Sequence, residues 1–298
     1  MTLQQLKYAV AVAECGNVTA ASQKIFISQP SLTTAVHELE KEIGITIFSR
    51  TNKGVVVTNE GDEFLGYARQ VLEQASLLEE KYLGKTQKQN RFSVTCQHYS
   101  FAVNAFVDVI KQFGGSEYDY TLKESRTSQI IDDVARLKSE IGILYMNKKN
   151  EEVISKLIKK NDLVFSELFT AKPHVFISTT NPLAKKEKIE LKDLDAFPYL
   201  TYEQGEYNSF YFSEEPLPNI DHKLNIKVSD RATLFNLLIG LNGYTVCSGV
   251  IDNELNGNNI VSRPLELDDF MKIGTVTHKN VVLSRYAQVY LKALKKYI

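Results

Sequence analysis

Small polar residues gather between Ser28 and His37, where they could read the edges of DNA bases. Ser28 can begin a helix, because its hydroxyl oxygen can accept a hydrogen bond from a free amide of the first turn. Pro30 falls in that turn, where its missing N–H is tolerated. A face of uncharged donors and acceptors suits base edges and phosphates in a major groove. The candidate DNA-binding residues of this stretch are Ser28, Gln29, Pro30, Ser31, Thr33, Thr34 and His37.

An apolar stripe along the same helix would keep that polar face outward. Leu32, Val36, Leu39 and Ile43 follow one another at intervals of four, three and four, so they share one side of a helix. Gly44 can end the helix in the left-handed conformation. The neighbouring elements are predicted as a helix opened by a capping box at residues 2–5, a second helix over 18–24, and a wing of two short strands over 45–58.

These residues resemble the N-terminal winged helix-turn-helix of the LysR-type transcriptional regulators. The positions that carry the resemblance are Ala20-Ala21, Ser28-Gln29-Pro30-Ser31-Leu32, Leu39-Glu40, Gly44, Phe48-x-Arg50 and Thr58. The resemblance covers the first eighty or so residues closely and the rest only in length and element order. It implies sequence-specific binding to double-stranded operator DNA, with Arg50 and Lys53 of the wing touching phosphates and the minor groove. Three helices that merely pack together would explain the apolar stripe but not the polar cluster.

Residues 59–84 are predicted to form one long helix capped by Thr58. Apolar side chains recur in it at intervals of four and three, which is typical of a helix-pairing seam. The alternative is a helix packed on its own domain. The resemblance implies that this helix pairs two subunits, giving a homodimer or a homotetramer. The seam residues are Phe64, Ala68, Val71, Ala75, Leu78 and Tyr82.

Beyond a polar hinge at 84–90, strands alternate with helices, a pattern that favours a parallel α/β sheet. The order resembles the two-lobed, periplasmic-binding-protein-like effector domain of the same family. The predicted domains are therefore 1–58 for DNA binding, 59–90 for the linker helix and hinge, and 91–298 for effector binding. Lobe I is expected over about 91–163 and 265–298, where the last helix (285–297) returns, and lobe II over about 164–264, starting with the strand 163–169.

Polar residues at the ends of predicted strands could bind a small effector, because ligands of such sheets lie beyond the carboxyl ends of the strands. Free amides at helix N-termini favour an anion such as a carboxylate. Arg126 could pair with that carboxylate or merely with a surface acid, whereas Arg231 is expected to form a structural ion pair. The alternative is that the hydroxyls are simply helix caps; the resemblance places Ser100, Thr127, Ser128 and Thr201 near effector positions. The candidate effector-binding residues are Gln97, His98, Tyr99, Ser100, Arg126, Thr127, Ser128, Thr201 and Tyr202.

Other kinds of site are not supported by the sequence. Cys96 and His98 have no further ligands spaced to complete a metal shell, so no metal is expected. Cys96 and Cys247 leave a redox-sensing regulator as an alternative, although both lie in apolar strand sequence typical of inert thiols. We find no nucleophile elbow, phosphate loop, HExxH or GxGxxG motif, and therefore expect no catalytic residues and no cofactor. A solute-binding protein without DNA function is a weaker alternative.

Composition places few further limits. The 298 residues carry a net charge of −1, and residues 1–58 hold five basic against four acidic side chains, so the DNA prediction rests on the motif. The start of the chain has no secretion leader, no apolar run is long enough for a membrane span, and three scattered cysteines do not suggest disulfides. We expect a cytoplasmic protein that contacts DNA, a small-molecule effector and RNA polymerase, but no membrane.

Overall fold

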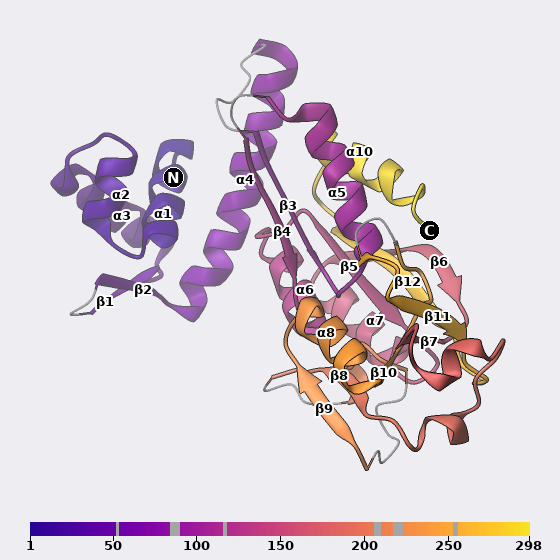
Figure 1. Ribbon diagram of the computed structural model, residues 1–298. Coiled ribbons are helices and arrows are strands. Elements are labelled where there is room, and N and C mark those ends of the chain that lie inside the picture. The colour runs from indigo at the N-terminus through magenta and orange to yellow at the C-terminus, as the bar shows by residue number, and fades with distance from the viewer. Residues whose placement is uncertain (52–53, 84–89, 116–117, 206–209, 217–222, 253–255) are drawn as a thin grey trace. The chain divides into compact units, whose positions relative to one another are not determined.

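The computed structural model describes every residue except 52–53, 84–89, 116–117, 206–209, 217–222 and 253–255 (Figure 1). The chain divides into two units, residues 1–88 with 135–137, and residues 89–134 with 138–298. The predicted hinge at 84–90 thus falls almost wholly outside the described residues. The long helix belongs to the same unit as the helix-turn-helix.

In the first unit, local signals in the sequence set the ends of the helices. Thr2 forms the predicted capping box, and Ser28 begins α3 by accepting a hydrogen bond from the Ser31 amide. Gly16 and Gly44 follow α1 and α3 at positive φ, where a residue without Cβ is least strained. The elements are α1 (Leu3–Cys15), α2 (Val18–Lys24), α3 (Gln29–Ile43), β1 (Phe48–Thr51), β2 (Gly54–Val57) and α4 (Asn59–Leu83).

The core of this unit is built on the stripe of α3. Leu32 and Leu39 are fully buried, Val36 is nearly so, and Ile43 packs at the edge. Leu65 and Ala68 of α4 join the same cluster as Leu39. The polar side of α3 is thereby turned away from the core.

Glu40 of α3 holds the wing in place. Its Oε1 accepts hydrogen bonds from the backbone amides of Ile47 at 2.7 Å and Phe48 at 3.0 Å. These amides precede and begin β1, which pairs antiparallel with β2. One carboxylate therefore connects α3 to the first strand of the wing.

The second unit contains two five-stranded sheets, which define two lobes. The sheet of lobe I has the order β4-β3-β5-β12-β6 and that of lobe II the order β11-β7-β10-β8-β9. Lobe I consists of β3 (Asn90–Cys96), α5 (Ser100–Phe113), β4 (Tyr118–Glu124), α6 (Thr127–Ala135), β5 (Ile141–Met146), α7 (Glu151–Lys160), β6 (Leu163–Ala171), β12 (Met271–His278) and α10 (Arg285–Leu294). Lobe II consists of β7 (His174–Ser178), β8 (Tyr199–Tyr202), β9 (Asn225–Val228), α8 (Arg231–Leu241), β10 (Tyr244–Cys247) and β11 (Ile260–Pro264), with short 3-10 turns η1 (Pro182–Lys185), η2 (Leu191–Leu194) and η3 (Phe210–Phe212).

Each sheet buries its faces against helices. In lobe I, Ile141, Ile143 and Tyr145 pack against α5 and α10, which lie side by side (Figure 1). On the opposite face of this sheet, the side chains of Ile130 and Val134 of α6 lie against Gly142 of β5. Successive side chains of a strand alternate between faces, so Ile141 and Ile143 point to the side of α5 and α10. In lobe II, α8 covers one face of the sheet and the segment with η1 and η2 covers the other.

The structure of this unit differs from the sequence prediction in two respects. The sequence predicts the strand at 163–169 as the start of lobe II, but β6 pairs antiparallel with β12 from Leu163↔His278 to Met271↔Ala171 and so completes the sheet of lobe I. Both sheets are also mixed rather than parallel, because β12 and β7 run against their neighbours. The last helix returns to lobe I as predicted, whereas β11, β12 and α7 are elements that the sequence pattern does not predict.

The predicted pairing seam on α4 divides into two parts. Ala68 is only 2% exposed and Phe64 packs on the same core, so these two residues stabilise their own unit. Val71, Leu78 and Tyr82 are exposed. The reason is position: the first turns of α4 lie against α1, so the apolar spacing there serves the fold of the monomer.

Across the described residues, no helix is both long and apolar enough to span a membrane.

The role of Glu40 gives a first prediction. Glu40→Ala leaves two partly buried amides without their acceptor, so we expect a loss of roughly 2–4 kcal/mol in the free energy of unfolding of the first unit, near the range for charged hydrogen bonds. Denaturant unfolding together with amide exchange of Ile47 and Phe48 measures it. Glu38→Ala removes an exposed carboxylate from the same helix and should change stability by less than about 0.5 kcal/mol. Equal losses in both variants would contradict the assignment.

Candidate functional site

The outer face of α3 presents the predicted DNA-reading residues, but not all of their hydrogen-bonding groups are free. Gln29, Ser31 and Thr34 are exposed, and the His37 side chain is 81% exposed. The Ser28 hydroxyl caps the helix and also bonds to the Ser31 hydroxyl at 2.7 Å. The Thr33 hydroxyl donates to the carbonyl oxygen of Gln29 at 2.9 Å.

The residues of this face therefore have different roles. Ser28, Pro30 and Thr33 shape and hold the helix, while Gln29 and Thr34 keep their polar groups directed to solvent. Arg50 lies on β1, but its side chain is not among those described, and Lys53 also lies outside the described residues.

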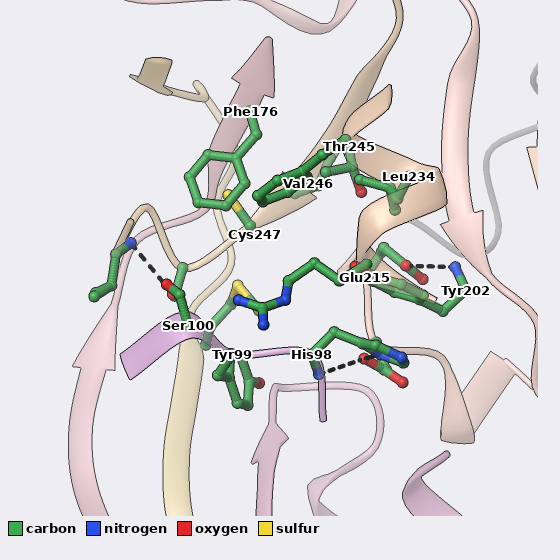
Figure 2. Close-up of a pocket in the computed structure, with 16 residues that line it drawn as sticks. His98, Tyr99, Ser100, Phe176, Tyr202, Glu215, Leu234, Thr245, Val246 and Cys247 are labelled. Carbon is green, nitrogen blue, oxygen red and sulfur yellow. Dashed lines mark hydrogen bonds and ion pairs between the residues drawn. The ribbon is translucent and has the colours of Figure 1, made fainter. Parts of the chain in front are cut away.

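The second unit has a pocket where residues of both lobes meet. Figure 2 shows side chains from lobe I, including His98, Tyr99 and Ser100, opposite Tyr202, Leu234, Val246 and Cys247 of lobe II. One part is polar and charged and the other is apolar. The lining residues are His98, Tyr99, Ser100, Phe176, Tyr202, Glu214, Glu215, Arg231, Leu234, Phe235, Thr245, Val246, Cys247, Ser248, Val250 and Met271.

His98 connects the lobes at the charged end of the pocket (Figure 2). Its ring stacks on that of Tyr202 with centroids 3.7 Å apart and planes 3° apart, and its Nδ1 lies 2.8 Å from Oε2 of Glu214. Both side chains of this ion pair are only 5–6% exposed. Burial alone would lower the pKa of His98, but the charge of Glu214 and its hydrogen bond outweigh burial, so the pKa is raised above its usual value. The His98–Glu214 pair therefore joins lobe I to lobe II.

Glu215 lies beside this pair but is held differently. Its Oε1 accepts the amide of Tyr202 at 2.9 Å, and its Oε2 lies 2.8 Å from the Ser213 hydroxyl. Burial, followed by the neighbouring charge of Glu214, raises the pKa of Glu215 to about 8. At neutral pH this side chain is mainly the uncharged acid.

Arg231 brings a second charge pair to the pocket. It is the first residue of α8, after the N-cap Asp230, and its Nη2 lies 2.9 Å from Oε1 of Glu124 at the end of β4. Burial raises the pKa of Glu124, although Arg231 opposes the shift. The predicted structural pair of Arg231 thus forms with Glu124, and the arginine lines the pocket as well.

Only four of the predicted effector-binding residues line the pocket: His98, Tyr99, Ser100 and Tyr202. Gln97 is fully buried, where its side chain donates to the Thr127 hydroxyl at 2.7 Å and accepts from the Tyr145 amide at 2.9 Å. Thr127 in turn donates to the carbonyl oxygen of Phe212 at 2.9 Å. Gln97 and Thr127 therefore hold the two strand–helix corners and part of lobe II together.

The remaining predicted residues also lie away from the pocket lining. Arg126 forms an ion pair with Glu203 at the boundary of the lobes, and Ser128 and Thr201 are partly buried outside the pocket. Sequence reasoning missed Glu214, Glu215 and the apolar residues of α8 and β10. No local motif marks the two glutamates, because only the fold brings residues 98 and 214 together.

The charged groups of the pocket are largely paired with one another. The two cationic groups, His98 and Arg231, pair with Glu214 and Glu124. Glu214 adds negative charge to a site for which the sequence suggested only helix N-termini. The expectation of an anionic effector stays a prediction.

The cysteines of this unit have inert surroundings. Cys96 is buried, and Cys247 lines the pocket; burial raises the pKa of both thiols above the usual value. A thiol with a raised pKa is a poor nucleophile at neutral pH, which argues against peroxide sensing. Within the described part of the chain, no group of three or more His, Cys, Asp and Glu side chains could hold a metal.

The enclosed free volume of the pocket is about 40 Å³. A buried water needs roughly 10–15 Å³ counted in this way, so about three waters fit. The lobes are therefore closed on each other, with polar contacts between them at His98–Glu214, Arg126–Glu203, Thr127–Phe212 and Glu124–Arg231.

Known proteins share both units of this chain. Residues 3–62 match the bacterial regulatory helix-turn-helix proteins of the lysR family, and residues 87–298 match the LysR substrate binding domain. The Hca operon transcriptional activator HcaR of Escherichia coli (strain K12) is 25% identical over 275 residues, 89% of this chain and 87% of that protein. The HTH-type transcriptional regulator TfdT of Cupriavidus pinatubonensis is 50% identical over 72 residues, 24% of this chain and 32% of that protein.

A solved structure has the same fold along the chain. A variant of full-length OxyR from Pseudomonas aeruginosa superposes with a TM-score of 0.71 at 20% identity, covering 99% of this chain and 95% of that one. The helix-turn-helix, the two-lobed unit and both family matches agree with one another. The chain therefore belongs to the LysR-type transcriptional regulators, DNA-binding proteins with an N-terminal helix-turn-helix and an effector-binding domain.

Proposed function

We propose that this regulator binds its operator with the first turns of α3 in the major groove and responds to a small molecule held between its lobes. The observation that carries the proposal is the exposed, uncharged face at the start of α3, opposite the buried side chains of Leu32, Val36 and Leu39. Gln29 and Thr34 read bases, because their polar groups are not used within the helix. Arg50 and Lys53 contact the phosphates and the minor groove beside them.

The regulator acts as a homodimer, or as a homotetramer of two such dimers, paired through the outer half of α4. Val71, Leu78 and Tyr82 support this assignment, because they repeat at helical spacing and are 45–69% exposed. Ala75 lies on the same line. Pairing of α4 places two reading heads over two half-sites of the operator.

The pocket is the effector site, and lobe closure is the response. The four polar contacts between the lobes support this, since a ligand that strengthens or replaces them shifts the balance between open and closed lobes. The protein works in the cytoplasm, contacts RNA polymerase at the promoter and has no enzymatic activity of its own.

Base reading by Gln29 is tested with DNA from the promoter upstream of its own gene. Wild-type protein should bind this DNA in a gel shift at low salt. Gln29→Ala should lose about 1–3 kcal/mol of discrimination between operator and unrelated DNA, because one side chain that can contact a base edge is removed. Fluorescence anisotropy against both DNAs measures the ratio.

The control for Gln29 is Gln23→Ala, which truncates an exposed glutamine at the end of α2. It should leave the ratio unchanged. Failure of the folded wild-type protein to shift promoter DNA would sink the assignment of α3.

The pairing surface on α4 predicts the size of the protein in solution. Leu78→Asp places a charge in an apolar contact, so we expect dissociation constants for the dimer to rise at least tenfold. Analytical ultracentrifugation across a concentration series measures this. Val282→Asp is the matched control, because Val282 is also 61% exposed but lies in the second unit. A wild-type protein that is monomeric at all concentrations would contradict the pairing.

The charged end of the pocket predicts a pH dependence of stability. The pKa values of Glu215 and His98 are both raised, so the folded state binds more protons than the unfolded state, and stability falls as pH rises. For Glu215 the loss runs from its usual value near 4.5 to about 8. A loss of 1 kcal/mol lowers Tm by about 2–4 °C for a unit of this size. We therefore expect Tm to fall by at least about 2–4 °C between pH 6 and 8.5.

The measurement is calorimetry of wild type and Glu215→Gln. Glutamine resembles the protonated acid and does not titrate, so the variant should show a flatter pH profile. Glu187→Gln, at an exposed position of the same lobe, should keep the wild-type profile. An unchanged slope in Glu215→Gln would rule out Glu215 as the source.

A further inference from the structure

We propose that the pocket between the lobes binds a small α-amino acid in its zwitterionic form, with an apolar side chain no larger than that of valine. This inference rests on the proposed role of the pocket as the effector site and goes further by naming the class of ligand. Three features of the lining carry it: a free acceptor, a free donor and a small apolar end.

The free acceptor belongs to Glu214. Its side chain is 6% exposed, and its Oε2 is used by His98. Its other oxygen, Oε1, is buried and has no hydrogen-bond partner among the described residues. A buried charged acceptor left without a partner costs free energy, which a donor would recover. The ammonium group of an amino acid supplies that donor, together with the matching charge.

The free donor belongs to Arg231. Nη2 faces Glu124, whereas Nη1 is buried and has no partner within the described parts of the chain. The pocket also receives the start of α5, a helix of fourteen residues whose N-cap Tyr99 makes no side-chain cap bond. The amides at such an N-terminus attract a carboxylate. Arg231 and α5 therefore offer a place for the carboxylate of the same ligand.

Charge balance selects a zwitterion over a simple acid or amine. Each cation of the lining already has one carboxylate partner, His98 with Glu214 and Arg231 with Glu124. A net anion or a net cation would add one uncompensated charge to a buried site, whereas a zwitterion adds none. Its ammonium and carboxylate would supply the partners that Glu214 Oε1 and Arg231 Nη1 lack.

Size and polarity set the side chain. Phe176, Leu234, Val246 and Met271 line the rest of the pocket and favour an aliphatic group (Figure 2 labels the first three). The free volume of about 40 Å³ favours the smaller amino acids, because a phenyl side chain would have to push the lobes apart.

The test compares L-valine with two analogues that each lack one charge. Isothermal titration of the full-length wild-type protein is carried out with L-valine, with isovalerate (no amine), with isobutylamine (no carboxylate) and with L-phenylalanine. We expect valine to bind at least tenfold more tightly than each of the other three. Glu214→Gln should weaken valine at least tenfold and weaken isovalerate much less, because only valine carries an ammonium group.

Glu187→Gln is the control, because it changes an exposed glutamate of lobe II that lies outside the pocket lining. It should keep valine affinity within about twofold. Glu203→Gln breaks an ion pair between the lobes and reports general loosening of the lobes. Equal loss in Glu203→Gln and Glu214→Gln would overturn the placement of the ammonium, because general loosening would explain both.

Other outcomes separate this inference from the proposed function. Isovalerate or isobutylamine binding as tightly as valine overturns the zwitterion but leaves the pocket as an effector site. Absence of binding by all four compounds, in a protein that still binds promoter DNA, overturns the ligand class and leaves the regulator intact. Valine binding that does not alter promoter affinity supports the ligand class and overturns the effector role.

Discussion

Charge buried between two lobes must be paired, and the second unit is built around that constraint. His98 comes from a strand end of lobe I, and Glu214 from a loop of lobe II that is distant in sequence. Neither could stay charged in that position without the other. Tyr202 stacks on the His98 ring, and Glu215, whose pKa is raised by burial, lies beside the pair. The proposed coupling between a small molecule and lobe position rests on this pairing.

The first unit also depends on a few hydrogen bonds. Hydroxyls of α3 are used both to hold the helix and to face solvent, so Ser28 and Thr33 support the helix that Gln29 and Thr34 extend from. Glu40 links that helix to the wing through two amides. In the proposed role of α3, reading DNA with few charges depends more on the position of the helix than on bulk attraction, in agreement with the nearly neutral composition of residues 1–58.

The sequence predicted local features well, because caps, apolar spacing and turn residues act within a few positions. Ser28, Gly44 and the stripe of Leu32, Val36 and Leu39 can be assigned from residue types and spacing alone. The pairing of segments that are distant in sequence cannot be assigned in this way. β6 joins lobe I through β12, more than a hundred residues later, and no local pattern states that partner. Glu214 and Glu215 could not be predicted for the same reason. The prediction of an anionic effector rested on helix N-termini alone. Local spacing can also mislead. Ala68 has the spacing of a dimer seam, but it packs in the core of its own unit.

The position of β12 has a consequence for biosynthesis. It lies between β5 and β6, so the central hydrogen bonds of the lobe I sheet cannot form until residues 271–278 have been synthesised. Lobe II, which is inserted between β6 and β12, leaves the ribosome first. Until then β5 and β6 each carry an unpaired edge, the kind of edge that invites pairing with other chains. A transcript cut short before residue 271 would yield a product with that edge open permanently, and such a product should aggregate or be degraded instead of occupying operators as a defective competitor.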